Sequence, residues 1–163
     1  MAERETEGTF YDFKVDYAEP EKIGTYISAL SNAALLAHQP YGYLIYGIDD
    51  KTHQAVGTKF KPASAKGKGN EDLGLWLIRL LTPHLPFEIH ELSITDKRVV
   101  LFLIPAAKSQ PTSFMKTKYI RIDSHVQRLD DYPLIEQNPY DGFQKKIVPR
   151  LYTLIPCFAI SSA

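Results

Sequence analysis

The chain has 163 residues, 44% of them hydrophobic and 23% charged, which fits one folded domain and excludes a disordered or collagen-like chain. Nineteen basic and nineteen acidic side chains cancel, which argues against a protein held to nucleic acid by bulk charge. The apolar run at residues 99–105 is well short of the roughly 18 residues that cross a membrane, and the acidic N-terminus lacks a signal-peptide layout. The single cysteine, Cys157, cannot form an internal disulfide, so we expect a cytoplasmic protein with no membrane partner.

The charges are distributed unevenly along the chain. Residues 1–21 carry seven acidic side chains against Arg4 and Lys14, whereas residues 51–70 carry five lysines and no acid. A second basic stretch, residues 97–121, has six lysine and arginine side chains and again no acid. Local fields therefore matter more than the net charge at distances near a Debye length of about 10 Å.

The first half of the chain predicts strand, helix and strand in that order. Residues 9–15 contain β-branched and aromatic side chains typical of a strand, and Pro20 suits the first turn of a helix that reaches about Leu36. Residues 43–48 are almost continuously apolar, which predicts a strand covered on both faces. We expect residues 54–57 to return beside this strand in a hairpin whose tip carries two aspartates.

The second half begins with an exposed loop and then predicts a helix and three strands. Residues 58–69 are rich in lysine, glycine and alanine and lack apolar periodicity. Asn70 is the expected cap of a helix with an apolar stripe from Leu73 to Leu81. Residues 87–94 and 98–104 predict a hairpin with a bulge at Glu91 and Leu92, and residues 119–123 predict a last strand.

Together these elements predict an α/β fold of the α+β type. We expect a mixed, mainly antiparallel sheet of five to six strands with two main helices packed on it. A short helix could follow at residues 130–137, and residues 134–163 form a C-terminal extension that could begin a further part of a longer protein. Residues 151–160 are too apolar to remain free in water.

Four carboxylates stand near the ends of the predicted strands. Glu7 and Asp12 lie around the first strand, with Lys14 close by, and Asp49 and Asp50 follow the central strand. If the sheet brings these ends together, three or four carboxylates meet, and such a group either shares protons or binds Mg²⁺ or Mn²⁺. The alternative interpretation is a strand with acidic ends beside an ordinary polar turn.

The lysines of the exposed loop also have two interpretations. Lys59, Lys61, Lys66 and Lys68 are either solvated charges or contacts for phosphate, since the glycines between them let the backbone approach a ligand. The Lys-Gly-Lys-Gly-Asn sequence lacks the spacing of a P-loop, so no motif for ATP is present.

Four motifs, in order and spacing, resemble the Schlafen AlbA-type domain family across residues 5–133. They lie at residues 7–14, 28–33, 42–50 with Val56-Gly57, and 119–124. The sequence departs from the family pattern at Asp12, where the Glu-Phe-Lys motif usually has glutamate, and at residues 35–41, which replace a short turn before a Gly-Gly pair. At residues 35–41 the sequence instead resembles a bacterial subgroup of the family, whose members are described as transcriptional regulators or divergent AAA ATPases.

The resemblance implies two functions for the chain, of which nucleic-acid binding in a bacterial transcriptional regulator ranks first, with DNA or RNA as partner. The residues expected to bind nucleic acid are Lys59, Lys61, Lys66, Lys68, Lys118 and Arg121. The alternative is an RNA-cleaving enzyme that uses Mg²⁺ or Mn²⁺, with Glu7, Asp12, Lys14 and Asp50 as catalytic residues and Glu7, Asp12, Asp49 and Asp50 as metal ligands. A third interpretation is a module that binds proteins or forms a homo-oligomer through the apolar C-terminal tail.

Overall fold

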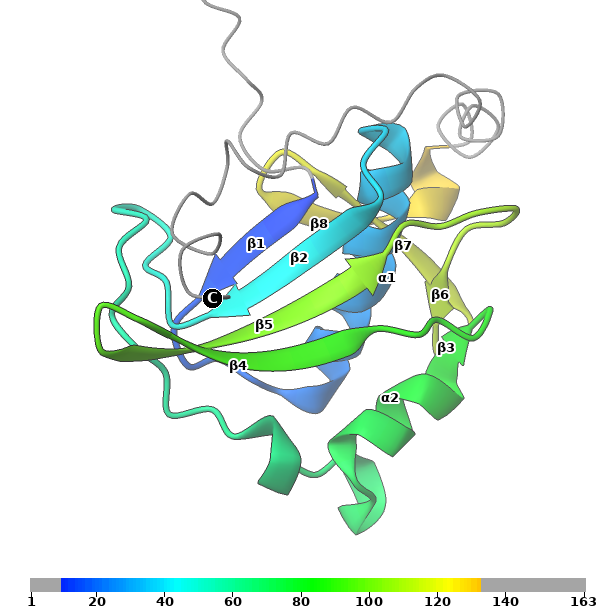
Figure 1. Ribbon diagram of the computed structural model, residues 1–163. Coiled ribbons are helices and arrows are strands. Elements are labelled where there is room, and N and C mark those ends of the chain that lie inside the picture. Colours follow the sequence, from blue (N-terminus) through cyan, green and yellow to red (C-terminus); the bar gives the residue numbers. More distant parts are fainter. Residues whose placement is uncertain (1–9, 133–163) are drawn as a thin grey trace, which may run out of the picture.

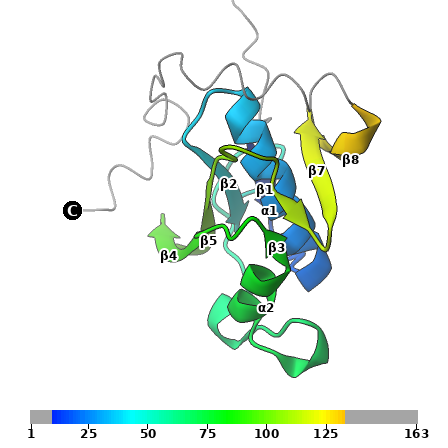
Figure 2. The same ribbon diagram turned by 90° about the vertical axis from the view of Figure 1, so that its right-hand side faces the viewer.

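The computed structural model describes residues 10–132, in which one long helix lies between two four-stranded sheets (Figures 1 and 2). Helix α1 (Pro20–Leu36) packs against strands of both sheets, and the shorter helix α2 (Leu73–Leu80) lies at one end of the molecule. Neither helix is long and apolar enough to cross a membrane. The expected α/β class is confirmed, but the strands form two sheets and not one sheet of five or six.

The first sheet has the strand order β1-β2-β5-β4. Its members are β1 (Tyr11–Lys14), β2 (Tyr41–Tyr46), β5 (Lys97–Pro105) and β4 (Glu88–Ile94). Strand β1 is parallel to β2 because α1 connects them as a crossover, and the other pairs are antiparallel. The central strands β2 and β5 carry apolar side chains on both faces, as their continuous apolar sequences predict.

The second sheet has the order β3-β6-β7-β8 and lies on the other side of α1 (Figure 2). It consists of β3 (Leu81–Thr82), β6 (Ser113–Phe114), β7 (Thr117–Ile122) and β8 (His125–Arg128), all paired antiparallel. Its strands are short, with only two residues each in β3 and β6, so the sequence pattern predicts β7 and not the others. Three 3-10 helices complete the described chain: η1 (Pro62–Ser64), η2 (Lys68–Asn70) and η3 (Leu129–Asp131).

Helix α1 is buried almost all round because sheets pack on two of its sides. Gly24 is required for this approach, since a Cβ there would lie 2.3 Å from the ring of Phe114. The polar side chains of α1 are satisfied by the second layer: Ser28 Oγ donates to the carbonyl of Thr112 (2.7 Å), and Asn32 exchanges hydrogen bonds with the backbone of the same residue (2.9 and 2.8 Å). These bonds fix α1 against the chain that leads into β6.

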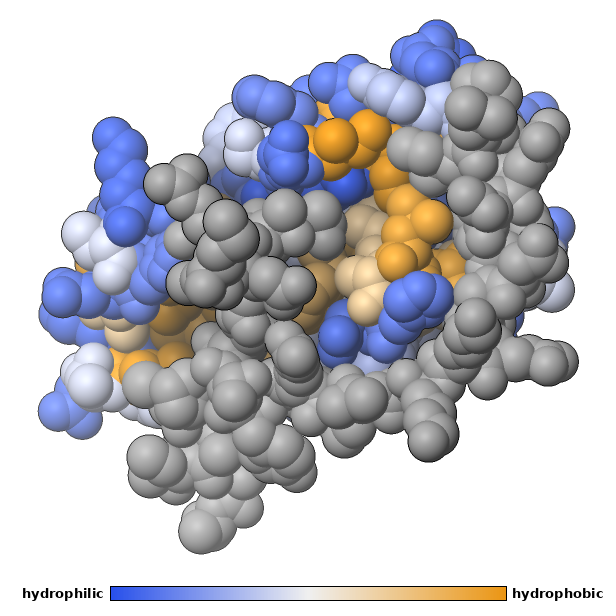
Figure 3. All heavy atoms as spheres, turned by 90° about the horizontal axis from the view of Figure 1, so that it is seen from above, coloured by the Kyte–Doolittle hydropathy of each residue, from blue (hydrophilic) through white to orange (hydrophobic). Residues whose placement is uncertain are grey.

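The largest apolar cluster lies between the first sheet and the helices. It contains Ile27 and Leu30 of α1, Trp76 of α2, and Tyr46 and Phe102 of the sheet. On the face seen from above, a patch of apolar side chains is visible among polar ones (Figure 3). Trp76 is a core residue in this arrangement, at 3% exposure.

Three local predictions are wrong. Residues 54–57 form no strand beside β2 and contribute only an isolated bridge between Ile48 and Ala55, because β1 and β5 already occupy both edges of β2. The pairing of β4 with β5 is continuous, so Glu91 and Leu92 form no bulge. Asp72, and not Asn70, caps α2, with its carboxylate accepting from the backbone N–H of Leu75 (3.2 Å).

Candidate nucleic-acid interface

The segment Thr58 to Asn70, which we call the lysine loop, crosses from the first sheet to α2 and has a fixed backbone. Phe60 anchors it in the core, with its ring centroid 4.8 Å from that of Tyr46 and stacked on Phe102 at 6.3 Å and 7°. Pro62 is buried as well. The expected exposed loop is therefore found, but its backbone contains two 3-10 turns and is tied to the core at Phe60 and Pro62.

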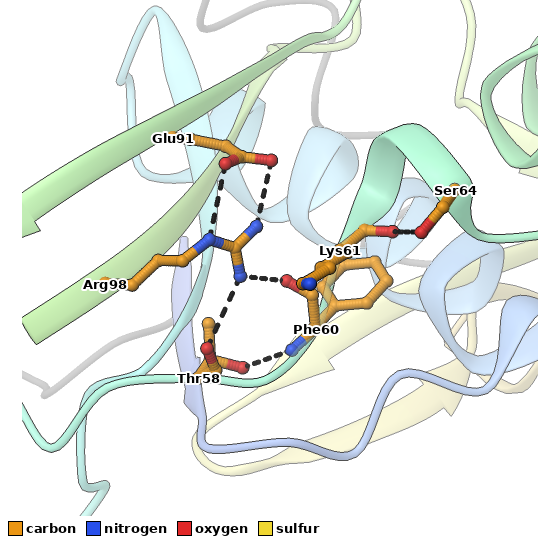
Figure 4. A network of polar contacts seen from close by, with 6 residues as sticks. All are labelled: Thr58, Phe60, Lys61, Ser64, Glu91 and Arg98. Carbon is orange, nitrogen blue, oxygen red and sulfur yellow. Dashed lines mark hydrogen bonds and ion pairs between the residues drawn. The ribbon is translucent and has the colours of Figure 1, made fainter.

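Arg98 of β5 holds the start of the lysine loop from the sheet side (Figure 4). Its guanidinium donates to the carbonyl oxygens of Thr58 (3.4 Å) and Phe60, and the opposite edge forms an ion pair with Glu91 of β4 (2.9 Å). The planar guanidinium thus joins two carbonyls and one carboxylate in fixed directions.

Asp16 holds the same part of the loop from the other side. Its carboxylate accepts from the backbone N–H of Lys59 (2.7 Å) and from the hydroxyl of Thr58 (3.0 Å). These two hydrogen bonds lower the pKa of Asp16, because they stabilise the ionised carboxylate. The chain just after β1 and the start of the lysine loop are therefore joined at neutral pH.

The far end of the lysine loop lies against α2 and the start of α1. A Cβ at Gly67 would be 2.3 Å from the indole of Trp76, so the backbone passes directly against this ring. The N–H of Gly67 donates to the carbonyl of Glu71 (2.8 Å), and the side chain of Lys68 forms an ion pair with Glu21 of α1.

The lysine side chains of the loop lie at the surface. Lys59, Lys61, Lys66 and Lys68 are all exposed, and in the part of the chain that the structure describes the first three form no ion pair. Gly69 has a φ of 74°, and no atom lies within 4 Å of the position its Cβ would take. The result is a positively charged surface on a backbone that is already ordered.

Two further residues predicted to bind nucleic acid lie on β7 of the second sheet. Arg121 is 8% exposed, and its guanidinium forms an ion pair with Asp12 of β1 (2.5 Å) and donates to the carbonyl of Asp123 (3.1 Å). Lys118 is half-buried. Neither belongs to the lysine loop, and the guanidinium of Arg121 is engaged within the fold.

Asp12 and Lys14 share this buried charge cluster. Asp12 is 3% exposed, and its second carboxylate oxygen lies 2.7 Å from Lys14 Nζ, a contact of opposite charges without good hydrogen-bond geometry. Lys14 Nζ also lies 4.9 Å from the ring centroid of Tyr26 on α1. The cluster connects one strand of each sheet across the molecule.

Asp49 and Asp50 lie in the turn beyond β2. Asp49 accepts from the backbone N–H groups of Lys51 (3.0 Å) and Thr52 (2.7 Å) and from the Thr52 hydroxyl (3.0 Å), and these bonds lower its pKa. Asp50 is exposed. Asp49 therefore has an evident structural role in its own turn.

The predicted carboxylates do not form a metal site among residues 10–132, where no three His, Cys, Asp or Glu side chains come close enough to hold an ion. Asp12 is level with Leu44 in the pairing of β1 with β2, whereas Asp49 and Asp50 lie beyond the end of β2. Both oxygens of Asp12 already face cations. Glu7, the fourth predicted ligand, lies outside the described residues.

Sequence reasoning missed the residues that order the lysine loop. Asp16 and Arg98 bond to it across 43 and 40 positions of sequence, and no local pattern marks such contacts. The one available signal was the apolar residues Phe60 and Pro62 within a lysine-rich stretch, since a free loop has no need of buried side chains.

A helix between two small sheets, with an ordered loop of exposed lysines at one end, defines an α/β domain with a local cationic surface. The family described as "Schlafen, AlbA_2" matches residues 7–130, and the chain belongs to this family. The resemblance deduced from the four motifs is confirmed. Membership supports a role related to nucleic acid at the level of the family.

No curated protein matches the sequence. Among solved structures, the chain is similar to the DIP2311 protein from Corynebacterium diphtheriae, with 16% identity and a TM-score of 0.48. The similarity covers 74% of this chain and 25% of that one, so the chain spans about a quarter of the length of that protein.

Proposed function

We propose that this domain binds DNA or RNA through the lysine loop and serves as the nucleic-acid-binding module of a bacterial transcriptional regulator. The observation that supports this proposal is the combination of a fixed backbone with exposed lysines that have no ion pair within residues 10–132. The family supports a nucleic-acid-related role, and the lysine loop is the surface with the chemistry to carry it.

Phosphate neutralisation is the physical basis of this binding. Each lysine that neutralises a phosphate releases condensed counterions, which gives affinity without requiring a positive net charge. Because Phe60, Arg98 and Asp16 already order the loop, binding costs less conformational entropy than it would for a free segment. Lysine contacts with phosphate do not distinguish one base from another. This surface therefore provides affinity, and any sequence preference depends on other contacts.

The test compares two triple variants of the full chain. The loop variant carries Lys59→Gln, Lys61→Gln and Lys66→Gln, and the control variant carries Lys51→Gln, Lys108→Gln and Lys116→Gln, which neutralises three exposed lysines elsewhere. Lys68 is left unchanged because it pairs with Glu21.

Fluorescence anisotropy with labelled RNA and labelled DNA, in EDTA, gives the affinities. We expect the loop variant to lose about tenfold or more in affinity and the control variant to lose much less. Equal losses in both variants, or no binding by the unmodified chain, would refute the proposal.

Divalent-metal-dependent RNA cleavage is the second proposal, and it rests on the family resemblance and on the exposed carboxylate of Asp50. Glu7, Asp12, Asp49 and Asp50 would hold Mg²⁺ or Mn²⁺. Asp12 fits this role poorly, because Arg121 and Lys14 already contact its oxygens. Incubation of labelled structured RNA with Mn²⁺ tests this second proposal. Cleavage that is abolished by Glu7→Gln or Asp50→Asn supports an enzyme, whereas RNA that stays intact refutes the proposal.

A further inference from the structure

One face of the first sheet is apolar and carries no described layer. Helix α1 and the second sheet lie on the same side of the first sheet, and no element within residues 10–132 covers its other side (Figures 1 and 2). We call this side the outer face. Its apolar residues come from all four strands and from the bridge that follows β2: Tyr11, Phe13, Tyr43, Ile45, Ile48, Ala55, Leu92, Ile94, Val99, Leu101 and Leu103.

The outer face is apolar on β1, β2 and β5, whereas the β4 edge also carries polar and charged side chains. Tyr11 and Phe13 pack ring against ring at 5.2 Å on β1, and Leu101 and Leu103 are half-buried on β5. The hydroxyl of Tyr43 is buried and has no hydrogen-bond partner among the described residues, and burial raises its pKa. A sheet with apolar side chains on both faces is stable in water when a layer packs on each.

Two segments of the chain lie outside the described residues, and they differ in chemistry. Residues 1–9 include Glu3, Arg4, Glu5 and Glu7, which are poor partners for an apolar sheet. Residues 151–160 contain no charged side chain and include leucine, isoleucine, phenylalanine, tyrosine and the single cysteine. Residues 151–160 therefore match the apolar character of the outer face.

The connecting chain is long enough for this contact. Eighteen residues separate Tyr132 from Leu151, and an extended chain of that length spans up to about 59 Å. A domain of about 120 residues has a radius of gyration of only about 14 Å. The apolar segment can therefore reach any part of the outer face from the last described residue.

We propose that residues 151–160 pack on the outer face of the first sheet in the same molecule. This contact provides the second layer that β2 and β5 require. It also covers the half-buried apolar side chains of this face, among them Phe13, Leu101 and Leu103, and leaves the lysine loop as a polar binding surface.

The single cysteine gives a direct test on the full chain, because a nitroxide attached to Cys157 broadens the NMR signals of nearby amides. We expect the amide signals of Tyr43, Leu101 and Leu103 to lose intensity and those of β8 to keep it. In the control, Cys157→Ser with Gln127→Cys places the label on β8, and the pattern should reverse.

A second label position guards against disturbance of the contact by the nitroxide. Cys157→Ser with Ser161→Cys places the label just beyond the apolar run and should broaden the same outer-face signals. Unchanged outer-face signals with both labels overturn the proposal.

Mixing the labelled chain with an isotope-enriched Cys157→Ser chain separates the two possible sources of the segment. No broadening of the enriched chain supports packing within one molecule. Broadening there identifies a second copy as the occupant, which overturns the proposal in favour of self-association.

Discussion

At the residue scale, the carboxylate of Asp12 is a candidate for two roles, that of a metal ligand and that of a buried ion-pair partner. Its position in the family motif suggested a metal ligand, whereas its neighbours in the fold are Arg121 and Lys14. A buried carboxylate needs compensation for lost hydration, and here two cations from β1 and β7 provide it. The sequence could not indicate this, because Arg121 lies 109 positions away from Asp12.

We predict that Asp12→Ala lowers the free energy of unfolding by about 3 kcal/mol, because it removes the carboxylate that faces the buried guanidinium of Arg121. Urea unfolding at neutral pH measures the change. Asp50→Ala, at an exposed position, is the control and should change stability by no more than about 0.5 kcal/mol. Adding Arg121→Met to Asp12→Ala should restore part of the loss, and a small effect of Asp12→Ala alone would contradict the structural role.

Asp16 gives a prediction about pH. Its pKa is lowered in the folded chain, so the stability it contributes is present above the pKa of the unfolded chain. That stability is lost as the pH falls through the lower, folded-state value. We expect the carboxyl ¹³C signal of Asp16 to report a pKa below 3.8, the ordinary value for an aspartate.

Thr58→Ala removes one of the two hydrogen bonds to Asp16 and should raise its pKa toward the ordinary value. The Lys59 backbone donor remains in this variant, so the shift should be partial. Titration of Asp16 at or above 3.8 in the unmodified chain would show that the loop is not held at this point in solution.

At the scale of elements, the spacing of apolar residues predicted the helices and strands that pack against a neighbour along their whole length. Helix α1 was expected at residues 20–36 and is observed as Pro20–Leu36, since its apolar side chains recur at helical spacing. Strand β5 was marked by its continuous apolar run. The second sheet was mostly missed because β3 and β6 have two residues each, too few to show any period.

The lysine loop illustrates the opposite case, in which tertiary contacts override a loop-like composition. Gly67 is central to its order, and we predict that Gly67→Ala displaces the loop from Trp76 and lowers the free energy of unfolding by about 1 to 3 kcal/mol. Thermal or urea unfolding measures this change. Tryptophan fluorescence should shift with it, because Trp76 is the single tryptophan.

Gly69→Asn is the matched control for Gly67→Ala. It changes a second glycine of the same loop at a position with open space, and asparagine tolerates the positive φ there better than other residues do. It should leave the Trp76 fluorescence unchanged. Equal effects of both substitutions would mean that close packing against Trp76 is not what fixes the loop.

At the scale of the whole molecule, the α/β class and the family followed from the sequence, and the division into two sheets did not. The order of elements was recognisable from local patterns, but the assignment of each strand to a sheet depends on α1 lying between two layers. The charge pattern along the chain identified the lysine loop as a candidate surface. Its ordered backbone became apparent only when Asp16 and Arg98 were seen beside it.

The salt dependence of nucleic-acid affinity tests the central claim most directly, because it counts the phosphates that the protein neutralises. The slope of log K against log salt should be shallower in the loop variant by about 2 on single-stranded RNA and by about 2.7 on duplex DNA. The control variant should keep the slope of the unmodified chain. Identical slopes for all three proteins, or a loss confined to the control variant, would contradict the assignment of the lysine loop as the nucleic-acid interface.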